Sequence, residues 1–178
     1  MEETLICDRL VQLIDPVKFR SGCLEYGASD DYSFENHLFE YENRNWKVLC
    51  LQPDENKFNN LRIYRRLAKL IDCEREDGIT IDGFIKRTNV QEIKILLIKN
   101  TKYPSRVLSG FDLSKYNTEI VCVQHPHYSE KRSVENILKN NGFEHFERVA
   151  VSDVYVKPGE MFSGELKEKS PNENLFEV

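Results

Sequence analysis

Apolar residues in this chain gather in short continuous runs, and the segments between the runs have helical spacing. Four runs are apolar almost throughout, which is typical of strands that are buried on both faces of a sheet. They are residues 22–26, 46–51, 93–98 and 118–123. Between them apolar residues recur every three or four positions, as in helices that pack one face on a sheet. This alternation predicts an α/β fold with a mostly parallel sheet covered on both faces.

Turn and capping residues set the expected ends of the helices. Pro16 ends the first helix, because a proline disfavours helical backbone at the residue before it. Asp54 or a neighbour can cap the helix after the second run, and the sequence Asn140-Asn141-Gly142 stops the last one. The expected helices are residues 4–14, a segment ending near 41, and residues 55–71, 81–87, 104–108 and 129–139.

The pattern changes after Gly142. Residues 143–151 and 154–156 alternate between apolar and polar, which predicts an antiparallel hairpin at a sheet edge. From Pro158 the chain is polar and rich in Glu and Lys, so we expect a tail that is extended or disordered. The expected organisation is one α/β domain over residues 1–157, with residues 1–16 as an entry helix, and a tail over 158–178. Apolar residues in the tail lead us to expect docking on a protein partner or on the domain.

Composition places the chain among globular proteins. It has 178 residues, 40% of them hydrophobic, and a net charge of −5, which gives no argument for nucleic acid as a partner. No apolar run reaches the length of a membrane span, and the acidic N-terminus lacks a signal-peptide pattern, so we expect a cytoplasmic protein. The five cysteines form no C-x-x-C pair. Because Cys23, Cys50 and Cys122 lie in apolar runs, we expect buried, reduced thiols and no metal site.

The loop after the first apolar run is the first candidate for chemistry. Residues 23–35 read CLEYGASDDYSFE, which predicts a buried strand, a tight loop and the start of a helix. In open α/β sheets this order brings the backbone and the N-terminus of a helix close to a nucleotide-like cofactor. Gly27 would allow that close approach. An ordinary turn glycine is an equally simple interpretation.

Five stretches in order along the chain resemble the FkbM family of S-adenosylmethionine-dependent methyltransferases. They are residues 24–36 (LEYGASDDYSFEN), 51–67, 79–100 and 107–125, and the segments NNGFEHF and VSDVYVKP near the C-terminus. The resemblance covers residues 22–157. It implies a Rossmann-like class I methyltransferase sheet, mostly parallel with a C-terminal antiparallel hairpin. It also implies S-adenosylmethionine as the cofactor and the O-methylation of a sugar or a related small molecule.

The resemblance also implies site residues. The candidate cofactor-binding residues are Glu25, Gly27, Ala28, Ser29, Asp30 and Gln52. Those from 25 to 30 stand where the family lines the amino-acid end of the cofactor, and Gln52 stands where it has an acid for the ribose hydroxyls. His125 is the candidate general base, because a neutral imidazole can accept a proton near pH 7. A capping or packing histidine is the alternative interpretation.

Other positions depart from the family's pattern. Lys99 and Thr101 stand where the family has Asp and Glu, and Gln124 stands where it has Glu. A positive charge at the first of these positions disfavours a cationic sulfonium cofactor. The chain is also short between Leu70 and Ile79, where the family has a further strand. We therefore expect a sheet that is shortened in the middle and lacks this strand.

Two function classes follow from these features. The replaced acids favour a degenerate methyltransferase-like protein, a pseudoenzyme that acts as a binding or structural module. The alternative is an active S-adenosylmethionine-dependent O-methyltransferase, which needs a small-molecule acceptor. A third hypothesis, an anion or nucleic-acid binder, would use a basic patch of Lys99, Lys102 and Arg106, with Arg65 and Arg66 as further candidates. The sequence shows no interleaved aromatic residues in its support.

Overall fold

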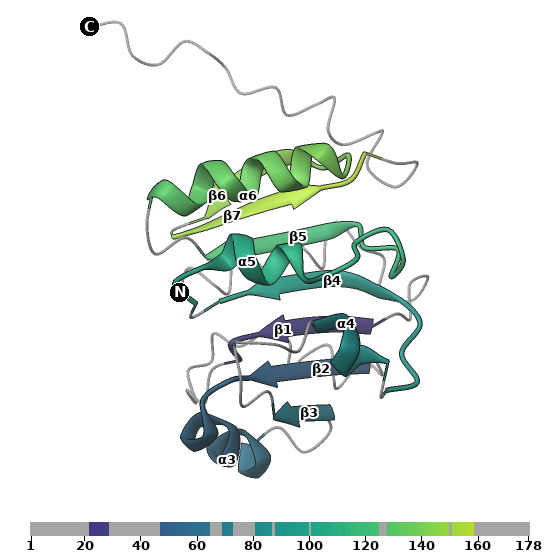
Figure 1. The fold of residues 1–178 in the computed structure, drawn as a ribbon, viewed down its shortest axis with the longest axis vertical. Coiled ribbons are helices and arrows are strands. Elements are labelled where there is room, and N and C mark those ends of the chain that lie inside the picture. Colours follow the sequence, from purple (N-terminus) through teal and green to yellow (C-terminus); the bar gives the residue numbers. More distant parts are fainter. Residues whose placement is uncertain are drawn as a thin grey trace, which may run out of the picture.

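One mixed sheet organises the part of the chain that the structure describes. This computed structural model describes residues 22–28, 47–64, 69–72, 81–86, 88–99, 101–124, 128–149 and 151–158. Seven strands are joined in the order β3-β2-β1-β4-β5-β7-β6 (Figure 1). They are β1 (Gly22–Tyr26), β2 (Lys47–Gln52), β3 (Lys69–Asp72), β4 (Ile93–Ile98), β5 (Ile120–Gln124), β6 (Glu144–Val149) and β7 (Ser152–Val156). The pairings from β3 across to β5 are parallel, and β7 runs antiparallel to both of its neighbours.

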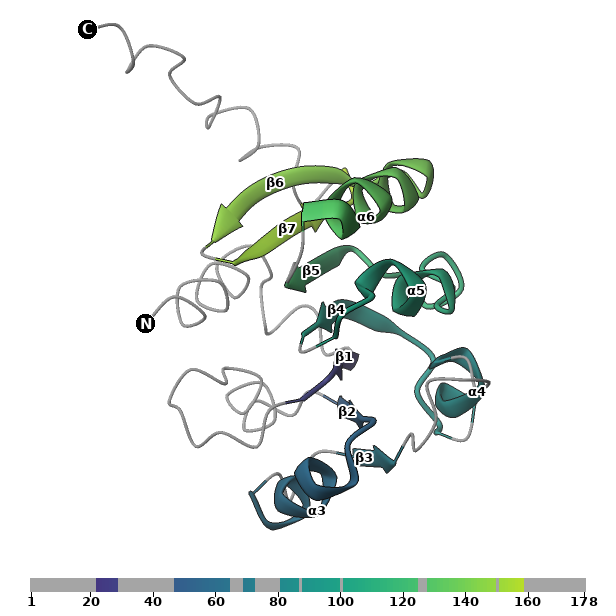
Figure 2. The same ribbon diagram turned by 60° about the vertical axis from the view of Figure 1, so that its left-hand side comes forward.

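Four helices are described, and α4, α5 and α6 lie on one face of the sheet (Figures 1 and 2). The helices are α3 (Glu55–Tyr64), α4 (Ile81–Ile85), α5 (Pro104–Ser109) and α6 (Tyr128–Asn140). The predicted caps are confirmed: Asp54 Oδ1 accepts a hydrogen bond from the Lys57 N–H, and Gly142, with φ +81°, follows α6. None of these four helices is long and apolar enough to cross a membrane.

The core forms where the apolar runs predicted buried strands. Every residue of β1 and β4 is buried, and so is every residue of β2 after Lys47. Cys23, Cys50 and Cys122 are buried in β1, β2 and β5, as predicted. The C-terminal hairpin is also confirmed, with β7 seated between β5 and β6. The mostly parallel sheet with an antiparallel hairpin therefore follows the prediction.

The middle of the chain corrects two predictions. The helix expected over residues 55–71 ends in the structure at Tyr64, and Lys69–Asp72 form strand β3. Consequently the prediction that a strand is missing here is wrong. The helical spacing of Leu67 and Leu70 was misleading, because residues 69–72 pair in parallel with residues 49–52 of β2. This pairing between distant segments prevails over the local pattern.

Several predictions fall on residues that the structure does not describe. They are the entry helix over 1–16, the helix ending near residue 41 and nearly all of the tail over 158–178. The boundary between domain and tail stays a prediction, as does the docking of the tail on a partner.

Candidate functional site

The strand order locates a candidate ligand site. From β1 the chain proceeds outward to β2 and β3, and it then returns to the other side of β1 with β4. Open α/β sheets bind ligands at such a switch point, beyond the carboxyl ends of the strands. Tyr26 and Ile98, the last residues of β1 and β4, are partners in the register. We call the residues at these ends, together with the neighbouring end of β2, the β1/β4 site.

The loop after β1 is held to the strands on both sides. Gly27 has a φ of +73°, a conformation that favours glycine. Its N–H donates to the Leu51 carbonyl at 2.8 Å, and the Ala28 N–H donates to the same oxygen at 3.4 Å. On the other side, the Lys99 N–H donates to the Tyr26 carbonyl at 2.9 Å. The loop therefore continues the parallel pairing for one further step and then turns.

Gln52 uses both ends of its amide to hold this loop. Its Nε2 donates to the Ala28 carbonyl at 2.5 Å, and its Oε1 accepts from the Asp54 N–H at 2.9 Å. The residue is 2% exposed. A carboxylate at this position could not donate to Ala28, because an ionised acid only accepts hydrogen bonds. In this structure Gln52 therefore has a structural role, joining the ends of β1 and β2.

Glu25 and Lys99 form an ion pair inside the β1/β4 site. The Lys99 Nζ lies 3.7 Å from the Glu25 Oε1, and the two side chains are 9% and 0% exposed. A buried carboxylate is costly unless a cation or hydrogen bonds compensate its charge. The basic residue that replaces the family's acid after β4 therefore lies beside the acidic residue on β1. The sequence carried a signal for this pair: a charged residue inside one apolar run and an opposite charge directly after the next one in space.

Two described residues of the β1/β4 site that would contact S-adenosylmethionine are engaged within the chain. That cofactor brings a sulfonium cation and an amino-acid end with an ammonium and a carboxylate group, and its two cations would compete with Lys99 for Glu25. It also brings ribose hydroxyls, whereas the Gln52 amide is engaged by the backbone at both ends. The structure thus brings together the predicted residues Glu25, Gly27, Ala28 and Gln52. The other predicted residues, Ser29, Asp30 and His125, lie outside the described residues.

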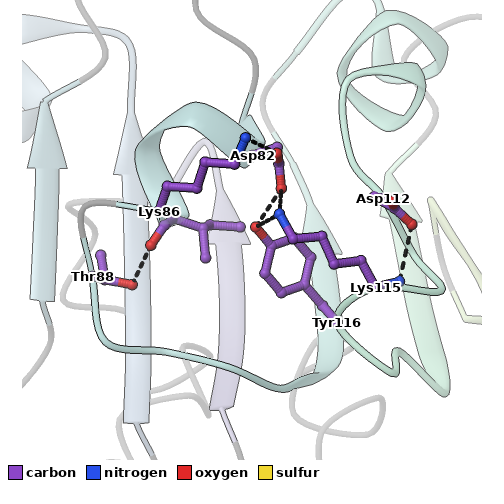
Figure 3. Close-up of polar contacts among 7 residues, drawn as sticks. Asp82, Lys86, Thr88, Asp112, Lys115 and Tyr116 are labelled. Carbon is purple, nitrogen blue, oxygen red and sulfur yellow. Dashed lines mark hydrogen bonds and ion pairs between the residues drawn. The ribbon is translucent and has the colours of Figure 1, made fainter.

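A polar cluster near the amino end of β5, opposite to the carboxyl ends that form the β1/β4 site, was not predicted (Figure 3). Asp82 of α4 accepts hydrogen bonds from Lys115 Nζ at 2.6 Å and from the Tyr116 hydroxyl, and it forms an ion pair with Lys86 at 3.1 Å. These hydrogen bonds, that of Lys115 first, hold the pKa of Asp82 far below its usual value. Because Lys115 and Tyr116 lie in the turn that leads into β5, the cluster fastens α4 near the start of that strand.

A second polar cluster joins the C-terminal hairpin to α6. Asp153 of β7 is fully buried, with His145 Nε2 at 3.0 Å, Lys131 Nζ at 3.3 Å and Arg148 Nη1 at 3.4 Å. Burial alone would raise the pKa of Asp153, but the hydrogen bonds from His145 and Lys131 outweigh it and lower that pKa. Three basic side chains around one carboxylate compensate its burial. We assign this cluster a structural role.

Comparison with known proteins identifies the fold. No family model matches the chain, and no curated protein matches it. Solved structures of methyltransferases do match. The TDP-rhamnose 3′-O-methyltransferase CalS11 is 12% identical with a TM-score of 0.62, and the match covers 89% of this chain and 79% of that one. The METTL16 methyltransferase domain is also 12% identical with a TM-score of 0.61, over 88% of this chain and 66% of that one.

A third match is a methylase of a ribosomal protein. The ribosomal protein L11 methylase from Lactobacillus delbrueckii subsp. bulgaricus is 9% identical with a TM-score of 0.56, over 86% of this chain and 77% of that one. Identities this low show a shared fold and nothing about a shared substrate. The Rossmann-like class I methyltransferase fold predicted from the sequence is confirmed.

Proposed function

We propose that this chain is an FkbM-like protein of the methyltransferase fold that does not transfer methyl groups and acts as a binding or structural module. The observation that carries the proposal is the ion pair of Glu25 and Lys99 at the switch point of the sheet. It supplies from within the chain the positive charge that a sulfonium cofactor would bring.

The size of the electrostatic effect supports this proposal. Two like charges about 4 Å apart repel each other by about 4 kcal/mol at an effective dielectric constant of about 20. A sulfonium group on the other side of the Glu25 carboxylate would lie about 8 Å from Lys99, where the repulsion is about 2 kcal/mol. A penalty of about 2 kcal/mol corresponds to a loss of affinity of about thirtyfold. Together with the engagement of Gln52, this penalty leads us to expect binding in the millimolar range or weaker.

Gln52 supports the same conclusion independently. Its amide gives the loop after β1 a hydrogen bond that an acid could not give, and it accepts one from the N–H of Asp54. Ribose hydroxyls would have to compete with these two bonds. Gln52, at the position of the family's acid, therefore has a structural role that does not depend on a ligand.

An active O-methyltransferase is the second candidate. The left-handed turn at Gly27, directly after β1, favours it, because this turn lets a ligand approach the backbone. In that case the cofactor would be S-adenosylmethionine, with a sugar or small-molecule hydroxyl as acceptor and His125 as the base.

Calorimetric titration with S-adenosylmethionine separates the two candidates. We expect no saturable heat for the wild-type chain at about 1 mM ligand. A dissociation constant in the micromolar range would refute the proposal and favour the enzyme. Two variants locate the cause: Lys99→Met removes the internal ammonium, and Lys102→Met removes an exposed charge from the same loop. Cofactor binding that appears with Lys99→Met and not with Lys102→Met would support the ion pair as the obstacle.

A further inference from the structure

Exposed tyrosines mark the ends of two helices. Large hydrophobic side chains that are exposed on the described part of the chain include Tyr103, at 55%, and Tyr128, at 89%. Tyr103 directly precedes α5, and Tyr128 is the first residue of α6. Tyrosine at this exposure is typical of interaction surfaces, where its ring supplies contact area at a low entropic cost.

The fold brings these two tyrosines to one place on the molecule. Helices α5 and α6 lie side by side on the same face of the sheet (Figures 1 and 2). Glu130 of α6 accepts hydrogen bonds from Ser105 of α5, at 2.6 Å from the hydroxyl and at 3.1 Å from the N–H. Each tyrosine lies two residues before one member of this contact. The beginnings of both helices, with their tyrosines, therefore form one surface.

Basic residues surround the tyrosines on this surface. Arg106 follows Tyr103 by three residues and Arg132 follows Tyr128 by four, so each arginine lies about one helical turn beyond its tyrosine. Arg106 and Arg132 are exposed, and Lys102 is exposed beside Tyr103. The one carboxylate within residues 102–106 and 128–132 is Glu130, which Ser105 engages. A chain with a net charge of −5 thus carries a locally basic surface.

We propose that this tyrosine–arginine surface, made of Lys102, Tyr103, Arg106, Tyr128 and Arg132, binds single-stranded nucleic acid. Aromatic side chains stack on the faces of bases regardless of sequence, and neighbouring lysine and arginine side chains neutralise phosphates. An acidic peptide would also neutralise the basic residues, but only a nucleic acid presents a planar base for stacking next to every phosphate. Tyr103 stands between Lys102 and Arg106 in the sequence, so the expectation that no aromatic residue is interleaved with the basic patch was wrong there. The fold adds Tyr128 from a distant segment. The proposal is independent of whether the β1/β4 site binds a cofactor.

Fluorescence anisotropy with a labelled single-stranded RNA of about 12 nucleotides tests the proposal on the full chain. We expect saturable binding at low salt. The double variant Tyr103→Ala/Tyr128→Ala should weaken it by about tenfold or more for each base that loses its stacking partner. The slope of log K against log salt should stay unchanged in this variant, because no phosphate contact is lost.

Charge reversal gives the complementary result. The double variant Arg106→Glu/Arg132→Glu should weaken binding and reduce the salt slope by about 0.7 for each lost phosphate contact. Lys139→Glu is the matched control for each of the two single reversals, because it makes the same charge change as one of them at an exposed position at the far end of α6. Circular dichroism verifies that each variant is folded.

Three results would overturn the proposal. The first is no binding by the wild-type chain at about 100 μM protein in about 50 mM salt. The second is equal affinity of the tyrosine double variant and the wild type, which would leave a diffuse attraction of charges. The third is displacement of the RNA by polyglutamate at an equal concentration of charge, which would point to an acidic protein partner instead.

Discussion

Removing the ammonium of Lys99 should be among the most destabilising changes in the sheet. The Lys99 Nζ lies 3.7 Å from a Glu25 carboxylate that is fully buried. At that distance the attraction is about 4 kcal/mol for an effective dielectric constant of about 20. Removing one partner of a buried ion pair costs about 3–5 kcal/mol, because the other charge stays buried without compensation. We therefore expect Lys99→Met to lower the free energy of unfolding by about this amount.

A double-mutant cycle isolates the contribution of the pair. Glu25→Gln removes the negative charge with little change of shape, and the double variant Glu25→Gln/Lys99→Met removes both charges. Replacing both members of a buried ion pair with neutral groups is often close to neutral in stability. We expect the double variant to be more stable than Lys99→Met, with a coupling energy of about 2 kcal/mol or more. Urea denaturation followed by circular dichroism measures each free energy of unfolding.

The control and the refutation use the same assay. Lys102→Met removes an exposed charge from the same loop and should change the stability by less than about 0.5 kcal/mol. If the effects of Glu25→Gln and Lys99→Met add within about 0.5 kcal/mol, the two groups are not coupled. The ion pair would then contribute no stability, and the electrostatic case against cofactor binding would lose its basis.

Three further predictions concern other parts of the fold. The hydrogen bonds from Lys115 and Tyr116 lower the pKa of Asp82 below its unfolded value, so they stabilise the fold above about pH 4 and lose this effect as the pH falls further. Asp82→Asn should therefore make stability less dependent on pH in acid, as urea midpoints between about pH 5 and 2 would reveal. Gly22→Ala should destabilise by about 1–3 kcal/mol or more, because its Cβ would lie 2.5 Å from the Glu92 carbonyl oxygen. Gly142→Ala, where φ is +81° and the added Cβ would lie 3.8 Å from Lys157 Cε, should cost about 1–2 kcal/mol in thermal or urea unfolding.

Sequence patterns predicted the elements whose burial is continuous. The runs of β1, β2, β4 and β5 are apolar on both faces, so their pattern differs from that of any amphipathic helix. Strand β3 was missed because it has four residues and adjoins a true helix, and only its pairing with β2 distinguishes it. The ion pair of Glu25 and Lys99 was missed for a similar reason. Each charge is apparent in the sequence, but only the strand order shows that β1 and β4, which carry them, are neighbours in the sheet.

Two departures from the pattern of the FkbM family, Gln52 and Lys99, lie beside Glu25 and Gly27, which match it. Asp82, Lys115 and Tyr116 belong to stretches that carry the resemblance, and they meet where β5 begins. Lys99 and Gln52 are departures, and they lie at the carboxyl ends of the strands.

The departures are also compensated within the chain. An active site that had merely lost its acids would leave buried polar groups without partners, at a cost of about 1–3 kcal/mol each. Here Lys99 lies beside Glu25, and Gln52 bonds to Ala28 and Asp54. Gln52 is satisfied by the protein itself, and Lys99 compensates the charge of Glu25 at 3.7 Å, a distance too long for a hydrogen bond. The engagement of these residues within the chain supports the proposal that the protein functions without a cofactor.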